Sequence, residues 1–472
     1  MGRHNTDHTY KILLIKLIHF LASVTMFYVA WLMFRYGKLT GIDKYGFRYN
    51  YFVAIAYGVM LYWFNRTYNA YLWGYTRIRK LVSGQIFSQF FSVAIVYVAV
   101  MIGWEQIRSP HYFMLLLVVQ FVWDVVVSYF GSLFFFKLNP PRKTLLVYRN
   151  ELDKRRFGMV KGKPMERLYK IVDELQYDGS FRDLEPYLSG YDAIFVAGVN
   201  SRCRNGILKY CKENSVRGFF LPHVGDTIMQ EAVHVQSFDS PVLYVNRKVL
   251  EPEYAFLKRA FDIISSGLAL VVLSPIMLIT GLAIHFYDGG PAFYKQVRLT
   301  KDGKTFRILK FRSMRVDAEK DGVARLSTGE NDDRITPIGK IVRKCRLDEL
   351  SQLWNIFVGD MSVVGPRPER PEIAEQYYET MPDFRLRLQV KAGLTGYAQV
   401  YGKYNTEPYE KLEFDLLYIN HMSILTDIQL CFATFAILFS KDSTEGVKTG
   451  KVTAMDVPVE DAAEEEEEAL TR

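Results

Sequence analysis

The run IISSGLALVVLSPIMLITGLAIHFY, residues 263–287, decides between two architectures for this chain. Its 25 residues include no Asp, Glu, Lys or Arg, and a helix of that length can span a hydrocarbon core of about 30 Å. Ser274 and Pro275 stand near its middle. Proline removes one amide donor and frees the carbonyl of Val271, which is costly in lipid unless the helix bends there. A straight spanning helix and a bent helix that enters and leaves by the same face both satisfy the run, so the residues alone leave this choice open.

Four more apolar runs lie within the first 136 positions. We predict four transmembrane helices, at residues 12–34, 49–65, 81–104 and 111–136. With the N-terminus inside, the cytoplasmic flanks hold nine Lys and Arg residues and the outer flanks five, which favours both ends inside. Asp124 is an acid within the last run, and we expect it to have a structural partner, His19 or Lys16, or a position near water.

The composition excludes several classes of protein. The chain has 472 residues, of which 49% are hydrophobic, 15% aromatic and 23% charged, which fits neither a disordered chain, nor collagen, nor a coiled coil. The net charge is +8, and residues 456–472 hold eight acids and one Arg, so the rest of the chain carries about +15. Such a charge suits an anionic membrane surface or substrates with phosphate groups. The four cysteines lack zinc-site spacing and indicate free thiols in a reducing compartment.

A small α/β domain follows the membrane section. Strand patterns at 144–148, 193–199 and 218–222 alternate with polar stretches, and residues 205–214 have a helical pattern. No glycine follows the first strand, and the turn at 197–200 contains only one, so a dinucleotide fingerprint is lacking. This favours a structural or regulatory domain and leaves nucleotide binding as the weaker alternative.

Residues 288–440 contain the candidate chemistry. Residues 293–296 and 306–309 predict a hairpin around Asp302 and Gly303, and a basic helix is expected at 338–345. A helix over 346–355 would place Leu347, Leu350, Leu353 and Trp354 on one apolar stripe.

Asp348 and Glu349 lie off that stripe. Adjacent helical residues point about 100° apart, so they cannot share a proton. Carboxylates among arginines such as Arg343 and Arg346 suit nucleophilic attack on phosphate, or metal coordination near it. The turn at 365–368 presents Arg367, whose planar fork of donors matches a phosphate, and the loop at 391–400 offers backbone amides.

From about residue 254 to 440 the chain closely resembles the bacterial sugar transferase family, the monotopic phosphoglycosyl transferases. The shared runs are KRAFD (258–262), the apolar helix with its Ser-Pro pair, FYKQVR (293–298), KFRSM (310–314), LDELSQLWNIFVGDMSVVGPRP (347–368) and GLTGYAQV (393–400). The preceding part resembles the large polyprenyl-phosphate glycose-1-phosphate transferase subfamily, with its transmembrane and Rossmann-like domains. Four flanking positions depart from the usual residues: Thr300 replaces Gly, Ser351 and Ala392 replace Pro, and Lys403 replaces Arg. These departures bear on the choice of sugar more than on the reaction.

The resemblance implies transfer of a sugar 1-phosphate from a nucleoside diphosphate sugar, usually a UDP sugar, to undecaprenyl phosphate. By the same resemblance Asp348 is the nucleophile that forms a covalent phosphosugar intermediate, and Glu349 helps Asp348 to hold Mg²⁺. It also implies that Arg343 and Arg367 bind phosphate groups, and Lys310 and Arg312 are weaker candidates for that role. The Ser274–Pro275 helix is re-entrant in this family, so all globular parts would share the cytoplasmic side.

The resulting expectation is an α-helical membrane domain with four spans, a small Rossmann-like α/β domain and an α/β monotopic catalytic domain with a re-entrant membrane helix. The expected segments are the transmembrane domain at 1–140, the Rossmann-like domain at 141–250, the re-entrant helix at 251–287, the catalytic domain at 288–440 and a disordered acidic tail at 441–472. The resemblance places the chain in the bacterial inner membrane, in the first membrane step of exopolysaccharide, capsule or O-antigen synthesis. We expect no nucleic-acid partner and keep a homodimer open.

Two other functions remain as alternatives. A nucleotide-sugar epimerase or dehydratase would need a GxGxxG motif and a YxxxK pair, which residues 144–249 lack. A non-catalytic membrane scaffold or sensor of a polysaccharide assembly complex would not need Asp348.

Overall fold

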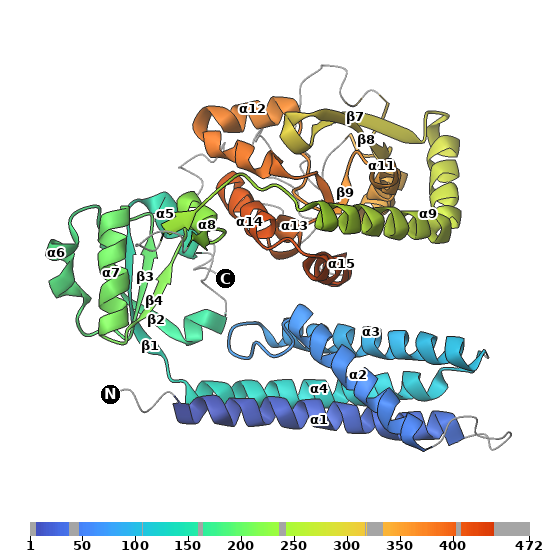
Figure 1. Cartoon of the computed structure of the whole chain (residues 1–472), viewed down its shortest axis with the longest axis horizontal. Coiled ribbons are helices and arrows are strands. Elements are labelled where there is room, and N and C mark those ends of the chain that lie inside the picture. Colours follow the sequence, from blue (N-terminus) through green and yellow to red (C-terminus); the bar gives the residue numbers. More distant parts are fainter. Residues whose placement is uncertain are drawn as a thin grey trace. The chain divides into compact units, whose positions relative to one another are not determined.

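The chain forms two compact units, Met1–His223 and Val224–Arg472, each with its own hydrophobic core. The structure is a computed structural model and describes residues 6–36, 47–105, 107–158, 164–235, 242–316, 318, 334–402 and 407–438 (Figure 1). The predicted acidic tail at 441–472 lies outside the described residues, and its disorder stays a prediction.

The first unit begins with four long helices packed on one another. They are α1 (Thr6–Tyr36), α2 (Arg48–Thr67), α3 (Ile78–Trp104) and α4 (His111–Leu138). Three of them are long and apolar enough to cross a membrane, at Tyr10–Tyr36, Ile78–Trp104 and His111–Leu138. The remaining predicted span, at residues 49–65, forms α2. Its tyrosines, Asn50 and Asn65 make this helix less apolar than the other three. In the described part of the chain, the fourth helix that meets both conditions is Pro252–Asp288, in the second unit.

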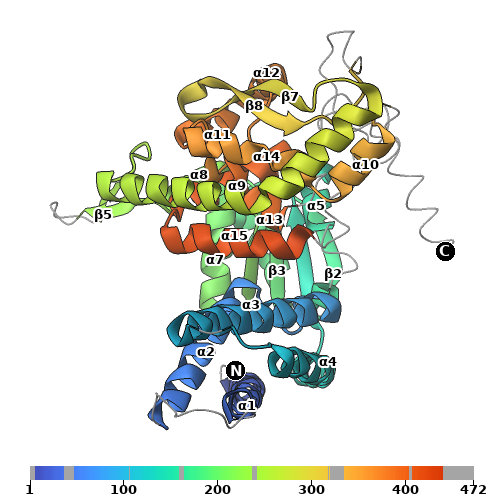
Figure 2. The same ribbon diagram turned by 90° about the vertical axis from the view of Figure 1, so that its right-hand side faces the viewer.

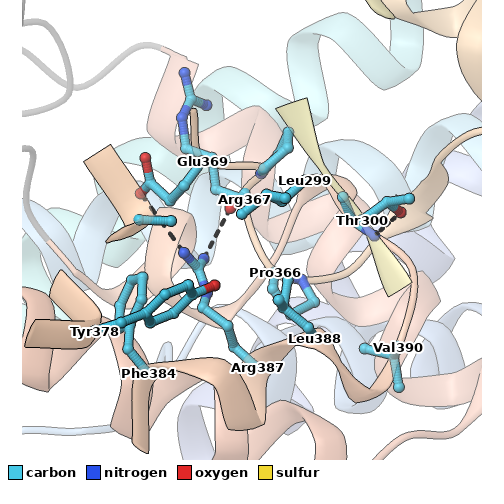
Figure 3. Close-up of a pocket in the computed structure, with 13 residues that line it drawn as sticks. Leu299, Thr300, Pro366, Arg367, Glu369, Tyr378, Phe384, Arg387, Leu388 and Val390 are labelled. Atoms are coloured by element: carbon cyan, nitrogen blue, oxygen red, sulfur yellow. Dashed lines mark hydrogen bonds and ion pairs between the residues drawn. The ribbon is translucent and has the colours of Figure 1, made fainter. Parts of the chain in front are cut away.

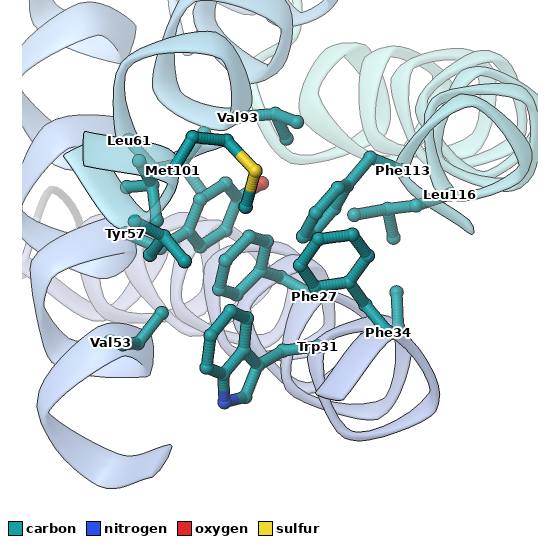
Figure 4. Close-up of a cluster of buried hydrophobic side chains, with 13 residues drawn as sticks. Phe27, Trp31, Phe34, Val53, Tyr57, Leu61, Val93, Met101, Phe113 and Leu116 are labelled. Carbon is teal, nitrogen blue, oxygen red and sulfur yellow. The ribbon is translucent and has the colours of Figure 1, made fainter. Parts of the chain in front are cut away.

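Aromatic side chains fill one end of the bundle (Figure 4). The ring of Phe27 stacks on that of Tyr57 with centroids 3.9 Å apart, and Phe113 lies 5.9 Å from Phe27 on another side. Trp31 is fully buried and donates its indole N–H to Asn50 Oδ1 at 2.9 Å. Large rings bury much apolar area, and polar atoms that no water can reach need a partner inside the bundle.

Asp124 lies in the interior of the same bundle. Its Oδ1 accepts a hydrogen bond from Gln89 Nε2 at 3.0 Å and lies 2.9 Å from His19 Nε2. His19 Nδ1 in turn lies 3.0 Å from the Tyr71 hydroxyl. His19 and Asp124 are 2% and 0% exposed. The predicted structural partner His19 is confirmed.

A four-stranded parallel sheet follows, with strand order β2-β1-β3-β4. Its strands are β1 (Arg142–Tyr148), β2 (Tyr169–Gln176), β3 (Ala193–Ala197) and β4 (Arg217–Phe220). The helices between them are α5 (Glu151–Gly158), η1 (Pro164–Arg167), α6 (Phe181–Leu184), η2 (Glu185–Leu188) and α7 (Ser201–Glu213). The predicted strands at 144–148, 193–199 and 218–222 and the predicted helix at 205–214 are confirmed. Strand β2 was not predicted, because as an edge strand it is mostly exposed and its polar sequence lacks an apolar alternation.

The second unit begins with the short helix α8 (Val224–Met229) and the antiparallel strands β5 (Val233–Val235) and β6 (Val242–Tyr244). Helix α9 (Pro252–Asp288) follows, and it has Pro275 in its interior. Both views show that α9 bends sharply (Figures 1 and 2). Ser274 Oγ donates a hydrogen bond of 2.8 Å to the carbonyl of Val271, the group that Pro275 leaves without an amide donor. A bent helix is therefore present, whereas its re-entrance into a membrane stays a prediction.

The remainder of this unit contains the candidate site. A hairpin of β7 (Phe293–Leu299) and β8 (Thr305–Phe311) turns through η3 (Lys301–Gly303), where Asp302 and Gly303 have φ angles of 61° and 73°, as the predicted DG turn requires. The later elements are α10 (Pro337–Lys344), η5 (Leu347–Glu349), α11 (Gln352–Val358), β9 (Ser362–Val364), α12 (Pro371–Thr380), η6 (Pro382–Gln389), β10 (Gly393–Thr395), α13 (Tyr397–Tyr401), α14 (Pro408–Asn420) and α15 (Ile424–Leu438). Apolar residues of β9, α12, α14 and α15 form the main core of the unit.

The observed architecture confirms a region of long apolar helices joined to α/β regions with parallel strands. The parallel strands of the second unit are β9 and β10, which pair with each other. Whether the first sheet belongs to the Rossmann type stays a prediction.

Candidate active site

Asp348 and Glu349 lie in a short 3₁₀ turn between two helices. Helix α10 ends at Lys344, and Arg346 has a left-handed φ of 55°, so the chain changes direction before η5. The predicted continuous helix over 346–355 is therefore wrong, since α11 begins only at Gln352. The apolar stripe is wrong for the same reason, because Leu353 is buried whereas Trp354 is 53% exposed. The turn η5 contacts strand β8 of the hairpin, and both carboxylates lie near Lys310 of that strand.

Two side chains of the segment after the carboxylates hold strand β8 beside them. Asn355 accepts the Leu309 N–H on Oδ1 at 2.9 Å and donates Nδ2 to the Arg307 carbonyl at 2.9 Å. Ser351 donates its hydroxyl to the Leu309 carbonyl at 2.9 Å. The outer edge of β8 is thereby satisfied by side chains, which fixes the position of the next residue, Lys310.

Arg367 stands on a turn that four hydrogen bonds to the backbone hold in place. Gly365 N–H donates to the Thr395 carbonyl at 2.8 Å, and Gly393 N–H donates to the Pro366 carbonyl at 2.9 Å. Arg387 Nη2 and Arg298 Nη1 donate to the carbonyls of Arg367 and Pro368, at 2.8 and 3.1 Å. The turn is thus fixed by its neighbours on both sides.

Glycine is required where this turn meets the loop before β10. A Cβ on Gly393 would lie 2.1 Å from the Gly365 nitrogen, and a Cβ on Gly365 would lie 2.4 Å from the Lys391 carbonyl oxygen. Both contacts are with backbone, so a larger residue would push the two segments apart.

Glu349 and Arg367 form the central ion pair of the site. Arg367 Nη2 lies 2.8 Å from Glu349 Oε1, and Arg346 Nη1 lies 3.9 Å from Oε2. Burial disfavours the charged form of Glu349, but Arg367, Lys310 and Arg346 outweigh it and hold the pKa of this carboxyl below its usual range. Glu349 is therefore a fixed anion at neutral pH.

The pKa of Asp348, in contrast to that of Glu349, lies above the usual range of a carboxyl. Burial and the neighbouring charge of Glu349 raise its pKa to about 6, against the effects of Lys310 and Arg343. Its Oδ1 is buried and has no hydrogen-bond partner among the described residues. Burial lowers the pKa of Lys310 to about 8, partly offset by Glu349. A carboxylate that is costly to ionise, with one free oxygen and cations around it, is typical of a reactive group.

Of the other predicted phosphate-binding residues, one lies near the carboxylates and one has another partner. Arg343 lies close enough to lower the pKa of Asp348, and its Nε donates to Ser313 Oγ at 3.0 Å. Arg312 is 7% exposed, and its guanidinium binds both carboxylate oxygens of Asp288 at the end of α9, with Nη1 2.9 Å from Oδ2. Its position ties the hairpin to α9, and its role toward phosphate stays a prediction.

A small pocket lies behind the Arg367 turn (Figure 3). Arg387 projects into it between Glu369 and the main chain of Arg367, and Tyr378 and Phe384 line one side. Arg387 is 3% exposed and is held by Asp415, with Nε 2.8 Å from Oδ2. The pocket has room for about one water molecule, so it supports the turn and cannot hold a sugar.

Two departures from the usual family residues meet in the structure. The Thr300 hydroxyl accepts the N–H of Ala392 at 3.2 Å. A proline at 392 would have no N–H to satisfy, so a hydroxyl at 300 and a non-proline residue at 392 compensate each other.

Several supporting residues were not predicted from the sequence. Ser351, Asn355, Arg298, Arg387 and Asp415 act through contacts between segments far apart in the chain. Ser351, Asn355 and Arg298 lie within the shared runs, which gave them no role of this kind, and Arg387 and Asp415 lie outside these runs.

The two carboxylates fit a divalent cation. Within the described residues no group of three or more His, Cys, Asp and Glu side chains could hold a metal ion alone. Mg²⁺ commonly takes one or two protein carboxylates and completes its shell with water and substrate phosphates. The free Oδ1 of Asp348 beside the ionised Glu349 suits that mode of binding.

Comparison with known proteins connects this geometry to a family. Residues 253–441 match the model of the bacterial sugar transferase family. The exopolysaccharide production protein PSS of Rhizobium leguminosarum bv. phaseoli is 41% identical over 187 residues, which are 38% of this chain and 92% of that protein. This chain belongs to the bacterial sugar transferase family.

Two further relatives have names that describe a reaction. The UDP-glucose:undecaprenyl-phosphate glucose-1-phosphate transferase of Klebsiella pneumoniae is 41% identical over 205 residues, 42% of each chain. The protein of the same name from Caulobacter vibrioides is 36% identical over 191 residues, which are 39% of this chain and 71% of that protein. This chain thus matches about two fifths of the length of the Klebsiella protein. The residues that match the family model, 253–441, contain the hairpin and both members of the Glu349–Arg367 pair.

Proposed function

We propose that this sugar transferase moves a sugar 1-phosphate from a UDP sugar to undecaprenyl phosphate, giving undecaprenyl-diphosphate sugar and UMP. The observation that carries the proposal is the Asp348 carboxylate, half-buried with one free oxygen, beside the Glu349–Arg367 ion pair. The names of the Klebsiella and Caulobacter relatives supply the substrate classes. The name of the Rhizobium relative supports a place in exopolysaccharide production.

The reaction would proceed through a covalent intermediate on Asp348. An Asp348 oxygen attacks the phosphorus that bears the sugar, and the bond from this phosphorus to the UMP oxygen breaks. A phosphate oxygen of the lipid then attacks the same phosphorus and releases Asp348. Arg367 and Arg343 would bind phosphate oxygens, and Lys310 would neutralise charge that develops near Asp348.

Asp348 and Glu349 would hold Mg²⁺. When bound, the ion would neutralise the diphosphate and stabilise the leaving UMP. Glu349 is suited to this position because its neighbours keep it ionised at neutral pH.

The bend of α9 supports a position at the membrane surface. The reactants are a water-soluble nucleotide sugar and a lipid phosphate at headgroup level, so the site must lie at the boundary between water and lipid. A re-entrant α9 would meet this requirement and leave the soluble parts on the cytoplasmic side of the bacterial inner membrane.

UMP release tests the proposal. Purified protein would be given Mg²⁺, undecaprenyl phosphate and each of several UDP sugars in turn. We expect one or a few sugars to give UMP in amounts that equal the lipid-linked product. Absence of UMP with every sugar, in protein shown to be folded, would contradict the proposal and favour a scaffold.

A further inference from the structure

Strand β9 leads directly into the turn that carries Arg367, and side chains of helix α9 hold its free edge. One edge of β9 pairs with β10, where Ser362 N–H donates to the Ala392 carbonyl at 2.9 Å. In such a strand the N–H of the middle residue, Val363, points to the opposite edge, where no strand lies among the described residues. Asp262 Oδ1 accepts this N–H at 3.0 Å and also accepts the Ser362 hydroxyl at 2.9 Å. Figure 1 shows β9 beside the beginning of α9.

Lys258, one helical turn before Asp262, holds the next residue of the strand. Its Nζ donates to the Val364 carbonyl at 3.2 Å and lies 2.7 Å from Asp427 Oδ2. The Tyr418 hydroxyl lies 3.1 Å from the same carbonyl and 2.8 Å from Asp427 Oδ1. Lys258, Asp427 and Tyr418 are all at least 90% buried. Three consecutive residues of β9 are thus contacted by side chains from α9 and α14, and Asp427 of α15 binds Lys258 and Tyr418.

Arg259 lies between Lys258 and Asp262 in α9 and binds the end of α11. Its Nη1 and Nη2 donate to the carbonyls of Ile356 and Phe357, each at 2.8 Å. These carbonyls belong to the last turn of α11, where the helix itself provides no donors. Helix α11 also contributes Asn355, which holds β8 beside the carboxylates.

We propose that Asp262, with Lys258 and Arg259, is a positioning residue that sets Arg367 against Glu349. The distance along the chain is short: only Gly365 and Pro366 separate β9 from Arg367, and proline restricts the backbone of that link. Through these three residues the first part of α9 holds β9, which leads to Arg367, and the end of α11, the helix that begins three residues after Glu349. The catalytic half of this inference rests on the proposed function.

The contacts predict that Asp262 acts as a hydrogen-bond acceptor. In Asp262→Ala the Val363 N–H and the Ser362 hydroxyl lose their acceptor in a buried place, so β9 and the following turn should loosen. Asparagine keeps an oxygen at the same position, so Asp262→Asn should restore both bonds. Ser265→Ala is the matched control on α9, since among the described residues the Ser265 hydroxyl bonds only to carbonyls of its own helix.

The first measurement is hydrogen exchange by mass spectrometry on the full-length protein in detergent, which needs no activity. In Asp262→Ala we expect exchange in residues 361–368 to be at least about tenfold faster, while peptides of α14 keep their protection. Asp262→Asn and Ser265→Ala should stay close to the native protein. Unchanged exchange at 361–368 in Asp262→Ala, or equal loosening throughout the unit, overturns the proposal.

The second measurement is UMP release in a double-mutant cycle with Arg367→Ala. We expect Asp262→Ala to lower kcat/KM at least about tenfold in the native background and much less in the Arg367→Ala background, because both changes act on the same side chain. Multiplicative effects of the two changes overturn a positioning role. If the native protein releases no UMP, the proposed function fails, and faster exchange in Asp262→Ala still supports the hold of Asp262 on the turn.

Discussion

Asp124 in the helical bundle and Asp348 in the sugar transferase unit have one feature in common. Each has a buried carboxylate oxygen without a hydrogen-bond partner among the described residues, Oδ2 in Asp124 and Oδ1 in Asp348. Their surroundings differ. Asp124 is 0% exposed, and its other oxygen is engaged by His19 and Gln89. Asp348 is half-buried and lies among Lys310, Arg343 and Arg346.

The comparison shows that an unpartnered oxygen does not by itself identify a reactive carboxylate. Asp124 contacts two other side chains of the bundle, His19 and Gln89, in the way that packed membrane helices use polar residues. Asp348 has access to solvent, cations that attract an anionic substrate, and a second acid that is already neutralised by Arg367. Access and local charge decide which of the two can do chemistry.

The largest effect should come from Asp348→Asn. This change keeps the size of the side chain but removes the nucleophile, so we expect UMP release to fall by at least about 10³-fold with thermal unfolding nearly unchanged. The assay is initial-rate UMP release at saturating UDP sugar. A variant with near-native rates would show that Asp348 is no more reactive than Asp124.

A straightened α9 tests whether access to Asp348 depends on the bend. Ser274→Leu with Pro275→Leu should yield a straight apolar helix that spans about 30 Å, and the protein should invert or adopt mixed topologies with loss of activity. Native Cys345 is exposed and lies beside the site, so it can report the side of the membrane to an impermeant thiol reagent. We expect no labelling of Cys345 from outside in native cells and labelling in the variant. Labelling of the native protein from the periplasm would refute the re-entrant helix.

The pH dependence should reflect Asp348 and Lys310. A carboxyl with a pKa of about 6 becomes an anion only above that pH, and an amine with a pKa of about 8 loses its charge above it. The profile of kcat/KM should therefore be bell-shaped, with apparent pKa values about 6 and about 8. In Lys310→Gln the basic limb should vanish, and the acidic limb should move to higher pH because a charge that favours ionised Asp348 is lost. An acidic limb near pH 4 in the native protein would contradict the site described above.

Asp124→Asn should have the smallest effect on catalysis. Asparagine retains an acceptor oxygen for Gln89 but weakens the contact with His19, so we expect a loss of about 1–2 kcal/mol in stability in detergent. UMP release per folded molecule should stay close to native, measured after correction for the folded fraction. A loss comparable to that of Asp348→Asn would mean that the bundle takes part in the reaction.

Elements with strong local patterns were predictable from the sequence, as the hairpin shows. Its turn needs two residues with positive φ, and Asp followed by Gly, here Asp302 and Gly303, is a preferred pair for such a turn. The partner of Asp124 was predictable because few polar side chains lie within the apolar runs. Strand β2 was not, since an exposed edge strand leaves no alternation of apolar residues. The helix predicted across Asp348 failed because Arg346 adopts a left-handed conformation, which the helical preference of arginine does not predict.

Residue types predicted individual members of the candidate site but not the contacts between them. Arg367 and Glu349 were chosen as separate residues, and the structure brings them within 2.8 Å. Their supports were beyond prediction, because Asp262 and Val363 are about a hundred positions apart and nothing local links them. Arg312 was predicted to bind phosphate as a basic residue in a shared run, but in the structure its guanidinium binds Asp288.

Trapping of the covalent intermediate tests the central claim most directly. The protein would be incubated with Mg²⁺ and the UDP sugar that supports turnover, without undecaprenyl phosphate, then quenched in acid, digested and examined by mass spectrometry. The account predicts one added sugar phosphate on the peptide that contains Asp348, no adduct in Asp348→Asn, and disappearance of the adduct when the lipid is added before the quench. Full turnover with lipid but no adduct on Asp348, or an adduct on another residue, would contradict it.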